Sequence, residues 1–221
     1  MHKLNVERLV VELERTVSRR PADDQFWLGI AGAPGSGKST LAAALHDQLN
    51  ASSVVVPMDG YHLYRHQLDA LPDSQTAHQR RGAPFTFDAA RCVRDLQLAK
   101  QSRTGSFPSF DHGIGDPVED AIVLNPSIRI VLVEGNYLLL DEDPWRKLQE
   151  SVFDESWFLD VPLDVCAQRV EARHIQTGKS PQRARERVLN NDLPNGRLIC
   201  ESSPQRSDRI LRFDSTEQPA F

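Results

Sequence analysis

Short apolar runs recur along the chain and are separated by longer, more polar segments. The runs occupy residues 26–31, 53–57, 128–134, 156–161 and 209–213. The run at residues 128–134 is apolar enough to be buried on both faces, as the strands of a parallel sheet are. We therefore predict a sheet of five strands, mainly parallel.

The segments between these runs carry apolar residues three or four positions apart, the spacing of an amphipathic helix. Helices are predicted on this basis over residues 3–20, 39–50, 88–101, 144–151, 162–176 and 181–190. Strands that alternate with helices indicate a doubly wound α/β fold, in which ligands bind at the carboxyl ends of the strands.

Two stretches have a weaker pattern. Residues 63–87 are polar and turn-rich without a clear period, and irregular segments of this length usually are functional or mobile. Residues 106–111 and 118–124 flank a turn that contains glycine and proline, and we interpret them as a strand pair or an extended arm.

A glycine-rich loop follows the first predicted strand. Its residues are Gly32, Ala33, Pro34, Gly35, Ser36, Gly37, Lys38 and Ser39, with Thr40 next in the predicted helix. This is the phosphate-binding pattern G-x-x-x-x-G-K-[ST] between a buried strand and a helix, so a turn that fits by chance is disfavoured. The glycines let backbone amides turn toward a polyphosphate. Lys38 is predicted to reach the β- and γ-phosphates, and the Ser39 hydroxyl to bind Mg²⁺.

Two acidic residues follow or end predicted strands on the same sheet edge. Asp59 is suited to accept the proton of an acceptor hydroxyl in line with the γ-phosphate, although Asp59-Gly60 is also a common turn pair. Glu134 ends an apolar strand and is predicted to order Mg²⁺ through a water molecule. The alternative for Glu134 is the solvated exit of the strand.

Basic residues follow the fourth predicted strand. Arg169 and Arg173 share one helix face, and we predict that they belong to a lid that closes on the phosphates. Arg183, Arg185 and Arg187 are interpreted as a solvated helix face.

Composition narrows the class of protein. The chain has 221 residues, which suits one α/β domain, and its net charge of −5 provides no basic field for nucleic acid or an anionic membrane. Cys92, Cys166 and Cys200 lie far apart, which argues against a disulfide framework and a zinc site. The first residues lack the apolar core of a signal peptide. We expect a cytoplasmic protein without a membrane partner.

A nucleotide-dependent switch and a non-catalytic nucleotide binder are the rival hypotheses. A GTPase switch would carry an Asn-Lys-x-Asp tetrapeptide and a transporter ATPase a Leu-Ser-Gly-Gly signature, and the chain has neither. The joint presence of Lys38, Ser39, Asp59 and Glu134 weighs against a non-catalytic binder.

Five motifs occur in a characteristic order: residues 29–40, 57–62, 81–88, 133–141 and 191–195. Together they resemble the P-loop kinase family of uridine kinase, phosphoribulokinase and bacterial pantothenate kinase. Within that family they most resemble the bacterial branch described as fructose transport system kinases. The resemblance extends from about residue 26 to residue 213.

The resemblance implies an ATP- and Mg²⁺-dependent kinase with a three-layer P-loop NTPase fold. The chain length predicts a single domain over residues 1–221, and the resemblance implies a small helical lid at about residues 169–190 within it. Asp59 would be the catalytic base and Glu134 part of the metal site. Lys38 would act with Arg169 and Arg173, which would bind phosphate, and Arg173 would also assist catalysis.

Acceptor contacts are implied on about residues 59–87 and 107–118. The expected contact residues are Asp59, Tyr61, His62, Arg81, Asp111 and His112. An arginine is expected after Asp111 in this branch, and the chain has His112 instead. Asn136, at the exit of the strand that ends in Glu134, is expected to line the same pocket.

The expected acceptor is a small metabolite, with a fructose-type sugar first. Uridine or another nucleoside and pantothenate are the alternatives. Related kinases often pair as dimers, so a homodimer is one expected state of this chain.

Overall fold

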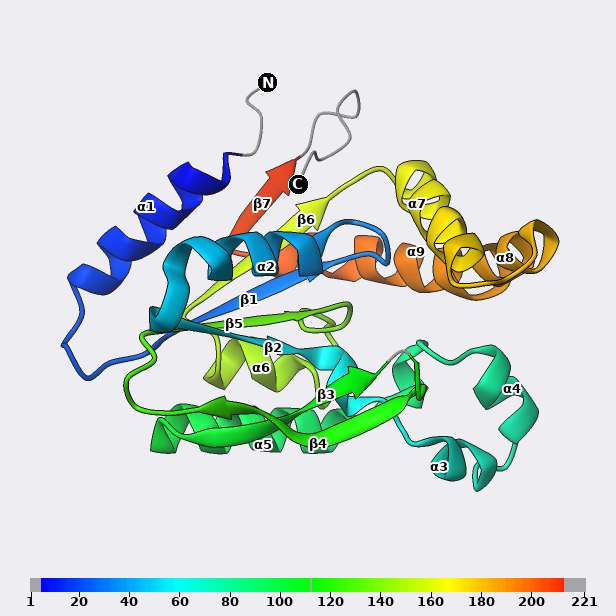
Figure 1. Cartoon of the computed structure of the whole chain (residues 1–221), viewed down its shortest axis with the longest axis horizontal. Helices are drawn as coiled ribbons and strands as arrows, with labels where there is room; N and C mark the ends of the chain where they lie inside the picture. Colours follow the sequence, from blue (N-terminus) through cyan, green and yellow to red (C-terminus); the bar gives the residue numbers. More distant parts are fainter. Residues whose placement is uncertain (1–4, 112, 213–221) are drawn as a thin grey trace.

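A twisted parallel sheet forms the centre of the molecule (Figure 1). The computed structural model describes residues 5–111 and 113–212. Its sheet has the order β2-β5-β1-β6-β7, and every neighbouring pair is parallel. The strands are β1 (Phe26–Gly32), β2 (Ser53–Pro57), β5 (Ile130–Gly135), β6 (Glu155–Asp160) and β7 (Arg209–Arg212). The prediction of five parallel strands is confirmed.

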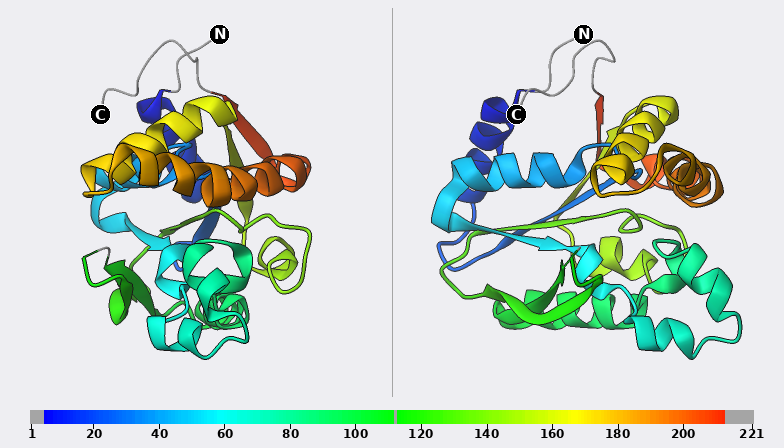
Figure 2. Two further views of the ribbon diagram at one scale, coloured as in Figure 1. Left: turned by 90° about the vertical axis from the view of Figure 1, so that its right-hand side faces the viewer. Right: turned by 45° about the vertical axis from the view of Figure 1, so that its right-hand side comes forward.

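Helices cover both faces of the sheet and complete three layers (Figure 2). On one face, α1 (Val6–Ser18) and α2 (Lys38–Leu49) bury Leu13 and Leu45 against the strands. On the other face lie α5 (Ala89–Ser102) and α6 (Arg146–Ser151). Asp88 caps α5 by accepting a hydrogen bond from the Arg91 amide. The predicted three-layer fold is therefore confirmed.

The segment 63–87 is more regular than predicted. It contains α3 (Arg65–Asp69) and α4 (Ser74–Gln79), and each buries a single side chain. Helices this short cannot produce a visible apolar period, which is why the prediction of an irregular segment is wrong there.

The C-terminal helices also differ from the prediction. The helix that begins at Pro181 is α8 (Pro181–Arg187), which continues through a π-helical turn, Val188–Asp192, into α9 (Leu193–Ser202). The sequence analysis did not predict α9. Pro194 and Gly196 disfavour a helix interior, and Pro194 follows directly after the π-helical turn.

A separate antiparallel hairpin confirms the predicted strand pair. It consists of β3 (Gly105–Asp111) and β4 (Asp116–Leu124). A Cβ atom added to Gly60 would lie 2.0 Å from the Pro108 carbonyl oxygen. Only glycine therefore allows β3 to approach the turn that follows β2.

The carboxyl ends of the parallel strands share one edge of the sheet. Beyond this edge, α7 (Leu163–Gln176), α8 and α9 lie on one side, and α3, α4 and the tip of the hairpin lie on the other (Figures 1 and 2). Within the described residues, no helix combines the length and hydropathy needed to cross a bilayer.

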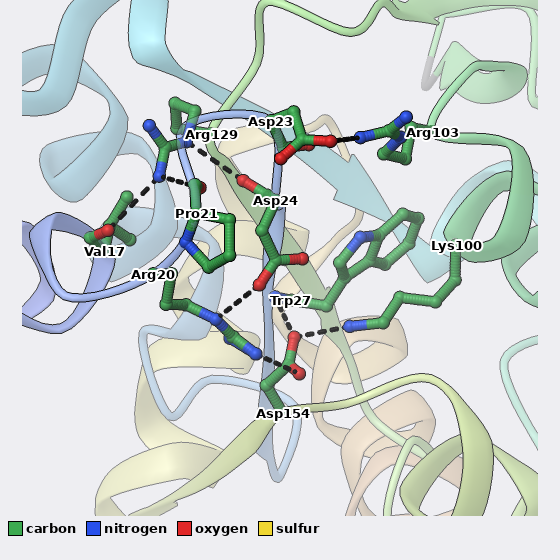
Figure 3. A network of polar contacts seen from close by, with 10 residues as sticks. All are labelled: Val17, Arg20, Pro21, Asp23, Asp24, Trp27, Lys100, Arg103, Arg129 and Asp154. Atoms are coloured by element: carbon green, nitrogen blue, oxygen red, sulfur yellow. Dashed lines mark hydrogen bonds and ion pairs between the residues drawn. The ribbon is translucent and has the colours of Figure 1, made fainter.

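A polar network ties the layers together at the opposite end of the strands (Figure 3). The Asp154 carboxylate accepts hydrogen bonds from the Trp27 amide at 2.8 Å and from Lys100 Nζ at 2.5 Å. Its other oxygen accepts from Arg20 Nη2 at 2.9 Å. One carboxylate thus joins the end of α1, the start of β1 and α5.

We expect Asp154→Ala to lower the free energy of unfolding by about 2–3 kcal/mol, because the substitution leaves the Trp27 amide and Lys100 without this acceptor and removes one of the two carboxylates that Arg20 binds. The midpoint of urea unfolding measures this loss. Asp23→Ala is the matched control: its carboxylate pairs with Arg103 at 2.7 Å, but its side chain is 77% exposed. Exposed pairs contribute little, so equal midpoints for the two variants would contradict the role of Asp154.

Candidate active site

The loop between β1 and α2 has the backbone of a phosphate cradle. Gly35 and Gly37 adopt φ values of +84° and +93°, in the left-handed region that favours glycine. A Cβ atom on Gly35 would lie 2.4 Å from the Cys166 carbonyl oxygen in α7, whereas one on Gly37 would meet no described atom within 4 Å. The loop therefore packs on α7 at Gly35 and borders open space at Gly37.

Some of the remaining loop residues are buried and others are exposed. Ala33 is buried, and Ser36 is buried with no hydrogen-bond partner for its hydroxyl among the described residues. Ser39 and Thr40 lie at exposed positions in the first turn of α2. Pro34 lines a small cavity together with Leu163 and Val170 of α7. The loop thus has a packed rear side and an open front.

Glu134 lies at the end of β5 and is only 6% exposed. The Ser39 hydroxyl donates to its Oε1 atom at 3.1 Å. Burial raises the pKa of Glu134, the positive charge of Lys38 opposes this rise, and the negative charge of Asp59 adds to it. The solvated strand exit considered for Glu134 is therefore wrong, and Lys38, Asp59 and Glu134 are close enough to interact electrostatically.

Asp59 lies in a 3-10 turn, Met58–Tyr61, directly after β2. Pro57 pairs in register with Glu134, and Ile30, near the end of β1, pairs with Glu134 on its other side. A Cβ atom on Gly135 would lie 2.4 Å from Met58 Cβ, so the ends of β2 and β5 are in close contact. Asp59 thus shares the sheet edge of the phosphate loop, while its role as a base stays a prediction.

The two predicted lid arginines differ in their surroundings. Arg169 Nη1 donates to the Gly35 carbonyl oxygen at 3.3 Å, so this side chain contacts the phosphate loop. Arg173, one turn later in α7, is exposed. Phosphate binding by either residue stays a prediction.

Tyr61 and His62 were expected to contact an acceptor. Tyr61 is 2% exposed within the apolar core, and burial raises the pKa of its hydroxyl group. His62 Nδ1 lies 2.8 Å from the Asp59 carbonyl oxygen, and its ring packs on Phe87 and Phe110 at centroid distances of 4.0 and 4.7 Å. His62 therefore positions the turn that carries Asp59.

Arg81 anchors the hairpin. Its guanidinium group donates to the carbonyl oxygens of Gly115 and Leu63 and to the Asp116 carboxylate, at 2.5, 2.8 and 3.2 Å. Asp111 Oδ1 accepts from the amides of Gly113 and Ile114 at 2.7 and 3.0 Å. Both side chains hold the hairpin turn, and contact with an acceptor stays a prediction for both.

The last two predicted acceptor contacts are His112 and Asn136. His112 lies outside the described residues. Asn136 directly follows β5, and its buried Oδ1 atom has no hydrogen-bond partner among the described residues. This oxygen is suited to accept a hydrogen bond from a bound molecule.

The sequence analysis missed a group of side chains that hold residues 79–82. Arg187 donates to the carbonyl oxygens of Gln79 and Arg81, so its interpretation as a solvated residue is wrong. Asn191 and Asn195 contact the same segment. The available signal was their spacing, since residues four apart share a helix face.

Comparison with known proteins identifies the family. Residues 27–181 match the model of the Phosphoribulokinase / Uridine kinase family, which is more than half of the chain. The chain belongs to this family. It is an ATP-dependent phosphotransferase of the P-loop kinase type, as the phosphate loop and its family relatives indicate.

Individual family members resemble the chain over most of its length. A Schizosaccharomyces pombe protein named as a candidate uridine kinase is 41% identical over 190 residues, which cover 82% of this chain and 80% of the relative. A crystal structure of a candidate fructose transport system kinase from Silicibacter sp. TM1040 has a TM-score of 0.80 and 34% identity, over 94% of this chain and 99% of that one.

The yeast kinase YFH7 from Saccharomyces cerevisiae shares the fold. Its TM-score is 0.82 at 23% identity, over 96% of this chain and 100% of that one. These likenesses confirm the predicted family and fold, and they leave the acceptor undecided.

We expect Glu134→Gln to make the metal-free protein more stable than the wild type as pH rises. The raised pKa of Glu134 means that its contribution to folding is present below the unfolded-state value of about 4.5 and is lost as pH rises through the folded-state pKa. Urea midpoints in a chelating buffer, between about pH 5 and about pH 8, measure this difference.

Glu119→Gln is a control of opposite sign. Hydrogen bonds from Arg91 and Tyr64 lower the pKa of Glu119 to about 2. Its ionised form therefore stabilises the fold above the unfolded-state value, so this variant should be less stable throughout the same pH interval. A Glu134→Gln protein that loses stability in the same way would contradict the effect of burial at Glu134.

Proposed function

We propose that this kinase transfers the γ-phosphoryl group of ATP directly to a hydroxyl group of a small metabolite. The observation that carries the proposal is the arrangement at the end of β5: the Ser39 hydroxyl of the phosphate loop donates to the buried Glu134 at 3.1 Å, and Pro57, two residues before Asp59, pairs in register with Glu134. A base, a phosphate-binding cation and a metal-binding carboxylate at one sheet edge are the groups that in-line phosphoryl transfer needs.

ATP would bind with its phosphates against the amides of the loop from Gly32 to Thr40. The left-handed Gly37 and the open space beside it support this assignment. Lys38 would contact the β- and γ-phosphates. Arg169, which contacts the Gly35 carbonyl oxygen, and Arg173 would add positive charge from α7 as the transferred group develops negative charge.

The proposed metal is Mg²⁺. Ser39 would hold it through the hydroxyl group and Glu134 through a water molecule, and the 3.1 Å hydrogen bond between the two side chains supports a shared site. Mg²⁺ commonly binds through one or two protein groups and the phosphates of the nucleotide. When bound, it would neutralise charge on the β- and γ-phosphates.

The proposed acceptor is a fructose-type sugar. The likeness to a candidate fructose transport system kinase supports this choice. The buried Oδ1 atom of Asn136, without a donor among the described residues, also suits a molecule rich in hydroxyl groups. Uridine is the second candidate, because the Schizosaccharomyces pombe relative is named as a candidate uridine kinase.

A panel of acceptors tests the proposal. The purified protein is given ATP and Mg²⁺ with fructose, other hexoses, uridine, cytidine or pantothenate, and ADP release is measured. We expect one class to raise ADP release well above the rate without acceptor. Steady ATP consumption that no member changes would contradict phosphorylation of these metabolites.

With the active acceptor, we expect Asp59→Asn to lower turnover by about 10²- to 10⁴-fold, the usual contribution of a general base, and to leave the KM for ATP nearly unchanged. Asp47→Asn is the matched control, because Asp47 is an exposed residue of α2. Turnover of the Asp59→Asn protein within a few-fold of the wild type would remove Asp59 from the role of base.

A further inference from the structure

Two buried asparagines link the C-terminal helices to the segment that carries Arg81. Asn191, in the π-helical turn, and Asn195, in α9, are 1% and 3% exposed. Asn191 Nδ2 donates to the Arg81 carbonyl oxygen at 3.1 Å, and Asn195 Nδ2 donates to the Gly82 carbonyl oxygen at 3.2 Å. Both amide groups therefore bind the main chain of one short segment.

Neighbouring side chains hold the asparagines and the same segment. Arg80 donates to Asn191 Oδ1 at 3.1 Å and to Asn195 Oδ1 at 3.2 Å. The Tyr137 hydroxyl donates to the Gly82 carbonyl oxygen at 2.6 Å. Burial lowers the pKa of Arg187, whose guanidinium group also binds this segment. Polar groups this deeply buried are costly unless paired, so their geometry is tightly specified.

Residues next to the two asparagines also lie close to the phosphate loop and to α7. A Cβ atom on Gly196, next to Asn195, would lie 3.6 Å from Ala33 Cβ in the phosphate loop and 2.9 Å from Leu163 in α7. Asp192, next to Asn191, has its Oδ2 atom 2.9 Å from His174 Nε2 of α7. The same α7 carries Arg169, which contacts the Gly35 carbonyl oxygen.

On the other side, the segment reaches the hairpin. Arg81, whose carbonyl oxygen Asn191 holds, places its guanidinium group on the Gly115 carbonyl oxygen and the Asp116 carboxylate. A continuous set of contacts thus runs from the phosphate loop through α9 and Arg81 to the hairpin turn. The π-helical turn is a rare conformation that is frequent at functional sites.

We propose that Asn191 and Asn195 are positioning residues that couple nucleotide binding to the arrangement of the hairpin turn at residues 113–118. They act through Arg81 and Gly82 and do not touch the reacting groups. If the hairpin borders the proposed acceptor, as the family resemblance implies for residues 107–118, the same coupling sets acceptor affinity. The proposal on coupling itself requires only nucleotide binding.

Hydrogen exchange tests the coupling without a known acceptor. The probe is the non-hydrolysable ATP analogue AMP-PNP with Mg²⁺, added to the full chain. In the wild type we expect slower amide exchange both in the phosphate loop and in residues 113–118. In Asn191→Asp, which replaces the amide donor by a carboxylate oxygen, we expect slower exchange in the phosphate loop only.

Asn190→Asp provides the matched control, because it introduces the same charge at the adjacent, exposed position. This variant should respond like the wild type in both regions. If Asn191→Asp fails to fold, as judged by circular dichroism and thermal unfolding, Asn195→Ser removes the second link and is measured in the same way. An unchanged exchange rate at residues 113–118 in the wild type, or an equal response in the asparagine variants, would overturn the proposal.

Kinetics separates positioning from general destabilisation. With an acceptor identified by the panel, Asn191→Asp should raise the acceptor KM at saturating ATP by about 10-fold, within the usual range of coupling between sites, and leave the Kd for ATP measured without acceptor within about twofold. An equal loss in that Kd would contradict positioning. If the asparagine variants lose the exchange response at residues 113–118 but no acceptor of the panel is active, only the proposed acceptors are contradicted. If the asparagine variants keep that response, only the role of the asparagines is contradicted.

Discussion

The arrangement of the site depends on one buried carboxylate, Glu134. A buried negative charge is unfavourable without partners, and Lys38 and the Ser39 hydroxyl provide them from the first turn of α2. Strand β5, which ends at Glu134 and Gly135, pairs in parallel with both β1 and β2, so the phosphate loop and the Asp59 turn lie at a common edge. A buried carboxylate that lowers folding stability is typical of functional sites, where stability is given up for ligand binding.

Glycines determine how closely the surrounding elements approach that edge. Gly35 brings the phosphate loop against the Cys166 carbonyl oxygen of α7, Gly60 brings β3 against the turn after β2, and Gly135 brings β5 against Met58. A side chain at any of these positions would push two elements apart. These close approaches pack the phosphate loop on α7, the hairpin on the turn after β2, and that turn on the end of β5.

Main-chain carbonyl groups join the two sides as well. The segment around Arg81 receives hydrogen bonds from Asn191, Asn195, Tyr137 and Arg187, while the Arg81 side chain holds the hairpin turn. These donors come from β5's exit and the C-terminal helices, far apart in the sequence. The region between the phosphate loop and the hairpin is therefore held by directional polar contacts, which specify geometry more narrowly than apolar packing does.

The sequence by itself determined the parallel sheet and the phosphate loop, because continuous apolar runs and closely spaced glycines are local signals. Its ordered motifs also determined the family. Only the tertiary structure decided the burial of Glu134 and Tyr61, the contact of Arg169 with Gly35, and the linkage of Asn191 and Asn195 to residues 81 and 82. Likewise, α9 was not predicted, since its proline and glycine obscure the helical period. These features arise between segments distant in sequence, and a side chain's type does not specify which distant main chain it will meet.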